Sequence, residues 1–264
     1  MYRLSINDVI DIVIQGPYTN FTDEVIDAYL QVELISNIFV SCWINDKEDE
    51  YRSDKVKFVR NVDCSLYSGV LNINMQLITS LNGVKASDAE YIMKMRSCQK
   101  VNHQGMINML NYFLENKKAK KIYICGNFFT HLFHPRDWIF MGHKEDMIKL
   151  FDIPFEKNDT CERMGINRNN CSSYMNLFTR PETYIGSYYC SRFDDRVATM
   201  VNQQEKYLYD GSPEWGYAKQ VSEEVMSKCF KSFPRKGIDL IWPKNNIYKL
   251  PFDCNHEEWD EEGF

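Results

Sequence analysis

The sequence lacks the short motifs by which several large enzyme classes are recognised. It contains no G-x-G-x-x-G fingerprint, no G-x-x-x-x-G-K-[ST] loop, no G-x-S-x-G elbow and no H-E-x-x-H helix. These motifs mark, in turn, dinucleotide-binding domains, P-loop enzymes, serine hydrolases and zinc peptidases. Each of these classes is therefore disfavoured.

Basic charge and long apolar runs are also scarce. The 264 residues carry 31 lysines and arginines against 37 acids, a net charge of -6, which disfavours a protein that coats nucleic acid or an anionic membrane. No run approaches the roughly 18 to 20 apolar residues of a membrane-spanning helix. Asp8 and Asp11 interrupt the first apolar run, so we expect no secretory signal. We expect a cytoplasmic protein with no nucleic-acid partner and no transmembrane segment.

Paired cysteine spacings are missing as well. The nine cysteines include no C-x-x-C pair and no zinc-like spacing. Cys42 and Cys125 lie within apolar runs, as expected of small buried thiols in a reducing compartment. The spacing of His131, His134 and His143 matches no metal-binding motif. The sequence therefore identifies no metal site.

The apolar pattern alternates between predicted strands and helices. The expected strands lie at 11–19, 37–45, 56–63, 89–97 and 121–129. The expected helices lie at 22–34, 72–87 and 103–121, and after a looser stretch at 180–193 and 218–233. Thr22 or Asp23 is the expected N-cap of the first helix, and Gly83 the expected stop of the second. This alternation is typical of an open α/β sheet with crossover helices.

No internal repeat or clear linker divides the chain, so we expect one domain over residues 1–264. Its last residues, 251–264, form an acidic tail.

Polar residues are concentrated where two of the predicted strands end. Ligands of open α/β sheets bind beyond the carboxyl ends of the strands. The stretch QGPYTN (15–20) follows the first strand, and its Gly16 allows close backbone approach. The stretch KMRSCQK ends the fourth, where alternation places Lys94 and Arg96 on one face. Adjacent cations favour a phosphate-bearing ligand. The alternative is a surface strand with salt bridges.

A third polar concentration lies between residues 131 and 151. Asp137 lies beside Trp138 in a partly apolar loop, where desolvation would raise its pKa and suit it to act as a general base. Glu145 and Asp146 open an expected helix. Acids in a first helical turn also serve simply to complement the helix dipole.

Several stretches, taken in order, resemble the WavE-type proteins of lipopolysaccharide core synthesis. They are DIVIQGPYT, FVSCWIND, NINMQLITSLNGVKAS, YIMKMRS, RDWIFMGHKEDMIKLF and RPETYIG. That family is regarded as nucleotide-sugar-dependent glycosyltransferases with a GT-A-like fold. The resemblance extends over roughly residues 9–190.

The resemblance implies a Rossmann-like open mixed sheet flanked by helices. A nucleotide-binding half would span about 1–125, and an acceptor-binding, catalytic half about 126–250. The resemblance assigns the nucleotide pocket to Gln15, Gly16, Pro17, Thr19, Asn74 and Gln76. Lys94 and Arg96 would face the diphosphate.

The sequence departs from the family pattern at two positions. Lys94, Arg96 and Ser97 match the strand-end pattern K-x-R-[ST]-D, but Cys98 replaces its final acid. That acid is the counterpart of a metal-binding Asp, and a protonated thiol is a poor ligand for Mg²⁺ or Mn²⁺. Met75 replaces a common Arg. Metal dependence is therefore left open: either the cations neutralise the diphosphate alone, or the activity is altered or lost.

The expected reaction is transfer of a sugar from a nucleotide-diphospho-sugar donor to a glycan hydroxyl, with inversion, in surface polysaccharide synthesis. Asp137 or Asp146, the latter next to Glu145, is the candidate base. Glu182 resembles the family's late Pro-Glu motif and would touch the sugar or the acceptor. The sequence specifies neither the donor sugar, the acceptor nor the oligomeric state.

Two other functions remain open. A non-catalytic binder of glycan or nucleotide is favoured by Cys98 and Met75. It is opposed by the retained acids, which are Asp137, Glu145, Asp146 and Glu182. A nucleotidyltransferase would need at least two metal-binding acids, which the Cys98 position disfavours.

Overall fold

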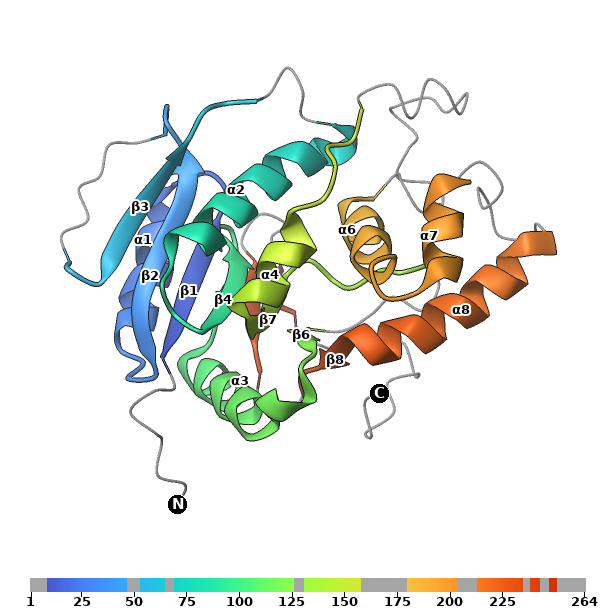
Figure 1. The fold of residues 1–264 in the computed structure, drawn as a ribbon. Coiled ribbons are helices and arrows are strands. Elements are labelled where there is room, and N and C mark those ends of the chain that lie inside the picture. Colours follow the sequence, from blue (N-terminus) through green and yellow to red (C-terminus); the bar gives the residue numbers. More distant parts are fainter. Residues whose placement is uncertain are drawn as a thin grey trace.

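A mixed sheet of seven strands organises the molecule (Figure 1). The computed structural model describes residues 9–46, 53–64, 69–125, 131–157, 180–203, 213–234, 238–242 and 247–250. The strand order is β3-β2-β1-β4-β7-β6-β8. Helices cover both faces, which confirms the expected α/β fold, a Rossmann-like open mixed sheet flanked by helices.

The strands of this sheet are short and mostly buried. They are β1 (Ile10–Gln15), β2 (Ile35–Trp43), β3 (Val56–Asn61), β4 (Tyr91–Arg96), β6 (Ile122–Ile124), β7 (Ile139–His143) and β8 (Phe230–Ser232). All six residues of β1 are buried. A strand covered on both faces is buried along its whole length, and β1 is apolar except at Asp11 and Gln15.

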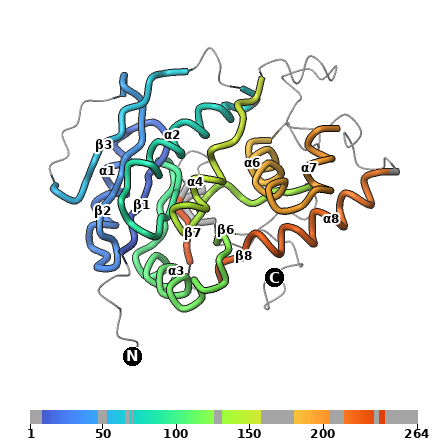
Figure 2. Tube along the Cα trace, viewed as in Figure 1, coloured from blue at the N-terminus to red at the C-terminus, as the bar shows by residue number. Residues whose placement is uncertain are grey.

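The helices described are α1 (Asn20–Leu30), α2 (Ile73–Ala86), α3 (His103–Asn116), α4 (Lys144–Phe151), α6 (Pro181–Cys190), α7 (Asp195–Asn202) and α8 (Pro213–Cys229). Two separate apolar cores lie on the two faces of the sheet. One core contains residues of α2, α4, α6, α7 and α8, and the other contains residues of α1 and α3. Figure 2 shows α6, α7 and α8 gathered on the side of the molecule away from β3.

Strand order and direction place a switch point between β1 and β4. Strands β3, β2, β1 and β4 are parallel neighbours, in the order of the first four strands of doubly wound folds. The chain winds outward from β1 to β2 and β3, and then returns to β4 on the other side of β1. Ligands of such sheets bind beyond the carboxyl ends at this point.

Several helix boundaries differ from those expected: the predicted helix 218–233 is α8 followed by strand β8, and the predicted helix 103–121 ends at Asn116. Two further differences have a local cause. Helix α1 begins at Asn20 after the N-cap Thr19, because the Thr19 backbone N–H donates to Thr22 Oγ1 at 3.0 Å. Helix α2 continues past Gly83 to Ala86. A Cβ on Gly83 would lie 2.4 Å from Val13 Cγ1, so this glycine allows helix and sheet to approach closely and is not the stop that we expected.

Three features were not expected from the sequence. Strand β7 pairs antiparallel with both β4 and β6, and α7 follows α6. A second sheet joins β5 (Lys100–Val101) to β9 (Leu240–Trp242) and β10 (Ile247–Leu250). The apolar run of β7 is too short to show a helical or a strand periodicity. Strand β5 is a strand only through its pairing with β9, which lies far along the chain.

The expected burial of cysteine is also confirmed in the described residues, where six cysteines are free thiols and four of these are buried. None of the helices described is both long and apolar enough to cross a membrane.

Candidate active site at the strand ends

The ends of β1 and β4 lie side by side. Gln15 and Arg96 are register partners, and the Ser97 backbone N–H donates to Gln15 O at 2.8 Å. Gly16 has a φ of +124°, and a Cβ there would lie 2.7 Å from Ser97 Oγ. The two polar stretches singled out in the sequence therefore meet at the switch point. Pro17 and Thr19 follow on the same edge and lead into α1.

Lys94 lies beneath this edge, fully buried. Its Nζ donates a hydrogen bond to the Asp137 backbone carbonyl at 3.1 Å and lies 5.5 Å from the centre of the Phe140 ring. Burial lowers the pKa of Lys94 to about 8. Strand β4 is central in the sheet, so the alternative of a salt-bridged surface strand is wrong.

Arg96 and Asp137 form the main ion pair of the site. Arg96 Nη1 lies 3.0 Å from Asp137 Oδ2 and 3.3 Å from Oδ1, and Gln76 Nε2 donates to Oδ2 at 3.0 Å. The Asp137 side chain is 1% exposed, whereas 31% of the Arg96 side chain is exposed. A ligand above the sheet can therefore reach Arg96, while Asp137 is enclosed.

The electrostatics of Asp137 oppose the expectation of a raised pKa. Burial by itself raises its pKa, but Arg96, Lys94 and the hydrogen bond from Gln76 outweigh burial and lower the pKa below the ordinary value. Asp137 is thus an ionised partner of the cations and a weak proton acceptor.

Glu182 lies in the first turn of α6, and its pKa is shifted in the opposite direction from that of Asp137. Burial, followed by the charge of Asp137, raises its pKa to about 7. Its Oε2 lies 3.8 Å from His134 Nε2, and 21% of its side chain is exposed. Burial lowers the pKa of His134 to about 3, so at neutral pH this contact involves a neutral imidazole. Glu182 is a mostly buried carboxyl group whose pKa lies near 7 and whose side chain is partly accessible to solvent.

We call Gln76, Lys94, Arg96, Asp137 and Glu182 the strand-end cluster. Burial alone would raise the pKa of both carboxyl groups, and the cations offset this effect for Asp137 more than for Glu182. The cluster therefore pairs an ionised acid with a proton-binding acid, an arrangement typical of functional sites.

Gly186 explains how α6 reaches this position. A Cβ at Gly186 would lie 2.1 Å from Phe133 O and 2.6 Å from Pro135 Cδ. The Phe133 backbone N–H also donates to Ser222 Oγ of α8 at 2.7 Å. The loop that carries His134 and Asp137 is therefore held between two helices. Sequence reasoning missed Gly186, although a glycine within a helical pattern is a known sign of close packing.

Asn74 has structural partners. Its Nδ2 donates to Glu156 O, and its Oδ1 accepts from the Glu156 backbone N–H, both at 2.7 Å. These bonds hold the segment after α4 against the start of α2. Asn74 lies two residues before Gln76 on α2, and both side chains are buried.

Glu145 and Asp146 lie at the other end of the sheet. They open α4 directly after β7, and β7 runs antiparallel to β4 with Tyr91 opposite His143. Six residues of β4 separate the two ends, about 17 Å at 3.3 Å per residue. Asp146 also pairs with Lys149, at 3.0 Å between Oδ1 and Nζ. The structure does not bring these acids to the strand-end cluster.

The residues at the strand ends do not fit a site for a hard divalent cation. Both carboxylate oxygens of Asp137 already accept hydrogen bonds, and Cys98 follows β4 in place of an acid. In the described ranges, no group of three or more His, Cys, Asp or Glu residues could hold a metal ion.

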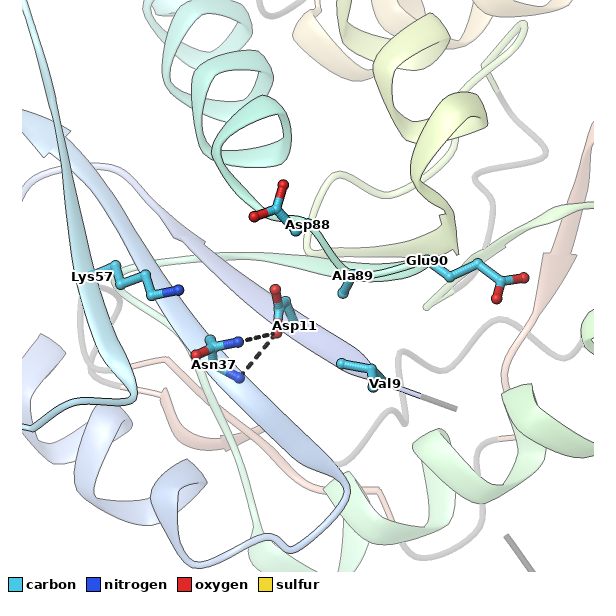
Figure 3. A pocket seen from close by; sticks show the side chains of 7 residues that line it. All are labelled: Val9, Asp11, Asn37, Lys57, Asp88, Ala89 and Glu90. Atoms are coloured by element: carbon cyan, nitrogen blue, oxygen red, sulfur yellow. Dashed lines mark hydrogen bonds between the residues drawn. The ribbon is translucent and has the colours of Figure 1, made fainter. Parts of the chain in front are cut away.

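A separate pocket of about 370 Å³ lies at the amino ends of β1 and β4 (Figure 3). Asp11 faces it, and its carboxylate accepts from the Asn37 backbone and side chain at 2.9 and 3.0 Å and from Ser87 Oγ at 2.6 Å. Lys57 extends from β3 toward Asn37 (Figure 3). With these bonds satisfied, Asp11 ties strands together, and none of the predicted site residues lines this pocket.

Comparisons with known proteins give a family and weak structural neighbours. The family model of WavE lipopolysaccharide synthesis matches residues 10–217. None of the curated proteins compared matches the chain. The crystal structure of HddC from Yersinia pseudotuberculosis is 12% identical with a TM-score of 0.37, over 56% of this chain and 81% of that chain. The same protein complexed with GMP-PN is 13% identical with a TM-score of 0.35, over the same shares of the two chains.

Proposed function

Because the chain belongs to the WavE lipopolysaccharide synthesis family, we propose that it transfers a sugar from a nucleotide-diphospho-sugar to a glycan hydroxyl. The observation that carries this proposal is the strand-end cluster. It combines a reachable guanidinium, a buried second cation and a carboxyl group that titrates near neutrality, all at the switch point of the sheet. The two cations are suited to bind a diphosphate, and the carboxyl group is suited to take the proton of an acceptor hydroxyl.

The donor diphosphate would lie against Arg96. Asp137 and Gln76 hold the guanidinium in place, and Arg96 can present two parallel N–H donors to phosphate oxygens. Lys94, whose pKa is about 8, still carries most of its positive charge at neutral pH beneath the same edge. Negative charge grows on the diphosphate as it leaves, and cations held in place beforehand stabilise that charge most effectively.

The nucleoside would lie over the turn after β1. Gln15, Gly16, Pro17 and Thr19 line this edge, and the backbone at Gly16 approaches Ser97 closely. In this proposal the first half of the chain, about 1–125, binds the donor. The second half, about 126–250, contributes Asp137 and Glu182.

Glu182 is the proposed general base. Its carboxylate would take the proton of the acceptor hydroxyl as that oxygen bonds to the sugar anomeric carbon and the bond to the diphosphate oxygen breaks. A base works best when its pKa lies near the working pH, which is true of Glu182 and untrue of Asp137. One base and one direct displacement give inversion. Glu145 and Asp146 have no part in this reaction.

A non-catalytic binder is the second candidate, and Cys98 favours it because the strand-end acid of the family pattern is missing. A binder would keep the diphosphate contacts of Arg96 but would have no use for a base at Glu182. The two functions therefore differ in what Glu182→Gln does.

The test begins with a thermal-shift screen of UDP-, GDP-, CMP- and dTDP-linked sugars, each with Mn²⁺ and with EDTA. A ligand at a hundred times its dissociation constant adds ~2.7 kcal/mol to the free energy of unfolding. We expect one nucleotide class to stabilise the protein. With that donor, Glu182→Gln should keep the thermal shift and lose transfer to added glycan by about 100-fold or more. No shift with any donor would refute donor binding, and full transfer by Glu182→Gln would refute the assigned base.

A further inference from the structure

A second, lysine-lined pocket lies at the opposite end of β4 from the strand-end cluster. Its volume is about 470 Å³, and Tyr91 at the start of β4 and His143 at the end of β7 line it. Its cationic wall is formed by Lys117, Lys118, Lys120, Lys121 and Lys149. Five lysines thus line one cavity, although the chain as a whole has a net charge of -6.

Two of these lysines are occupied by the protein itself. Lys149 pairs with Asp146 at 3.0 Å, and Lys121 Nζ donates to Ser227 O at 2.6 Å. Ordinary structural roles account for both.

Lys118 and Lys120 differ from them. Both are exposed, and among the residues that the structure describes neither forms an ion pair. Three acids, Glu90, Glu145 and Asp146, also line the pocket. Asp146 pairs with Lys149, and Glu90 Oε1 lies 3.9 Å from His143 Nε2. Like charges crowded around one cavity raise the local potential, and a bound anion would lower it.

The helix dipole accounts for only part of this cluster, because Lys117 is the C-cap of α3 and complements the dipole there. The last turn of α3 contains no basic residue, and the lysines follow in the short 3-10 turn Lys117–Ala119 and beyond it. Charge–dipole stabilisation fades within the last turn of a helix. Lys149 reaches the same cavity from a different helix.

The floor of the pocket is aromatic. Tyr91 and Phe113 are packed edge to face with ring centroids 5.3 Å apart, and Lys117 Nζ lies 4.8 Å above the Tyr91 ring. A cationic rim over an apolar floor suits a phosphate group carried on a larger organic molecule better than a bare inorganic ion.

We propose that this lysine pocket binds the phosphate group of a second ligand, through Lys118 and Lys120, at the end of the sheet opposite the strand-end cluster. The group could belong to a soluble phosphorylated sugar or to a phospholipid head group, which share this chemistry. The proposal does not rest on the proposed sugar transfer, because it concerns different residues about 17 Å away along β4.

Isothermal titration calorimetry at low ionic strength tests the soluble source, with glucose 1-phosphate compared with glucose. Cosedimentation with vesicles of phosphatidylglycerol and phosphatidylcholine, compared with phosphatidylcholine alone, tests the lipid source. The test variant is Lys118→Ala/Lys120→Ala, in which two exposed side chains are shortened. The control is Lys55→Ala/Lys85→Ala, which removes the same charge from exposed lysines that do not line this pocket.

We expect one phosphorylated probe to bind, with weakening in high salt. Lys118→Ala/Lys120→Ala should weaken that binding at least tenfold, whereas the control and Arg96→Ala should change it less than twofold. Binding of the sugar phosphate identifies a soluble ligand, and binding of anionic vesicles alone identifies a lipid head group. Binding of neither probe, equal weakening by the control variant, or loss of binding in Arg96→Ala would overturn the proposal.

Discussion

Replacing Glu182 by glutamine should make the protein more stable at alkaline pH while lowering transfer by about 100-fold or more. Burial and the neighbouring Asp137 raise the Glu182 pKa from 4.5 to about 7. The folded protein therefore binds this proton more tightly than the unfolded chain does, and stability falls as pH rises from about 4.5 to about 7. At about 1.36 kcal/mol per pKa unit, the ionised carboxylate costs on the order of 3 kcal/mol above pH 7.

Glutamine keeps the shape of glutamate without this charge, so the gain should follow the same pH window. Urea denaturation at pH 8.5 should show Glu182→Gln more stable than the parent protein by about 2–3 kcal/mol, with the difference falling below about 1 kcal/mol at pH 5. Glu115→Gln, at an exposed position on α3, is the matched control and should change stability by less than about 0.5 kcal/mol at either pH. Equal or lower stability of Glu182→Gln at pH 8.5 would refute the assigned electrostatics.

Three further substitutions test the scaffold around the site. Asp137→Asn should lower the free energy of unfolding by about 3 kcal/mol at neutral pH, because it leaves Arg96 without its carboxylate. This loss should become smaller in acid, where the carboxyl group of the parent protein is itself protonated. A loss that does not depend on pH would contradict the ion-pair account. Gly186→Ala should lower the melting temperature and donor binding together, since a Cβ would lie 2.1 Å from a loop carbonyl; unchanged melting would show that the loop yields easily. Asn74→Ala should cost about 2–3 kcal/mol in urea denaturation, as two hydrogen bonds to the Glu156 backbone disappear, and a cost below about 0.5 kcal/mol would mean that they contribute little.

The sequence was informative where local pattern decides the structure. The β-branched run that became β1 and the alternation of β4 were enough to place Gly16 and Arg96 at neighbouring strand ends. Parallel strands of an open sheet end at one edge, so two separate polar stretches could be expected to meet there. The order of family-like motifs then predicted the fold class.

The features that could not be predicted from the sequence depend on contacts between segments far apart in the chain. The direction of β7 is set by its partners β4 and β6, and that direction carries Asp146 to the far end of the sheet. Asp137 lies beside an indole in the sequence, which suggested a raised pKa, yet the cations that lower it come from a strand about 40 residues earlier in the chain. The raised pKa of Glu182 comes first from burial and then from the charge of Asp137, and both depend on the folded arrangement.

The contribution of Arg96 to the affinity for the donor tests the proposed donor site most directly. The measurement is isothermal titration calorimetry of the nucleotide sugar found in the thermal-shift screen, with the parent protein, Arg96→Ala and the exposed-lysine control Lys55→Ala. We predict that Arg96→Ala weakens donor binding at least tenfold, about 1.4 kcal/mol, through loss of a charged phosphate contact, while Lys55→Ala leaves binding unchanged. Equal donor affinity in Arg96→Ala and the parent protein would contradict a diphosphate site at the end of β4.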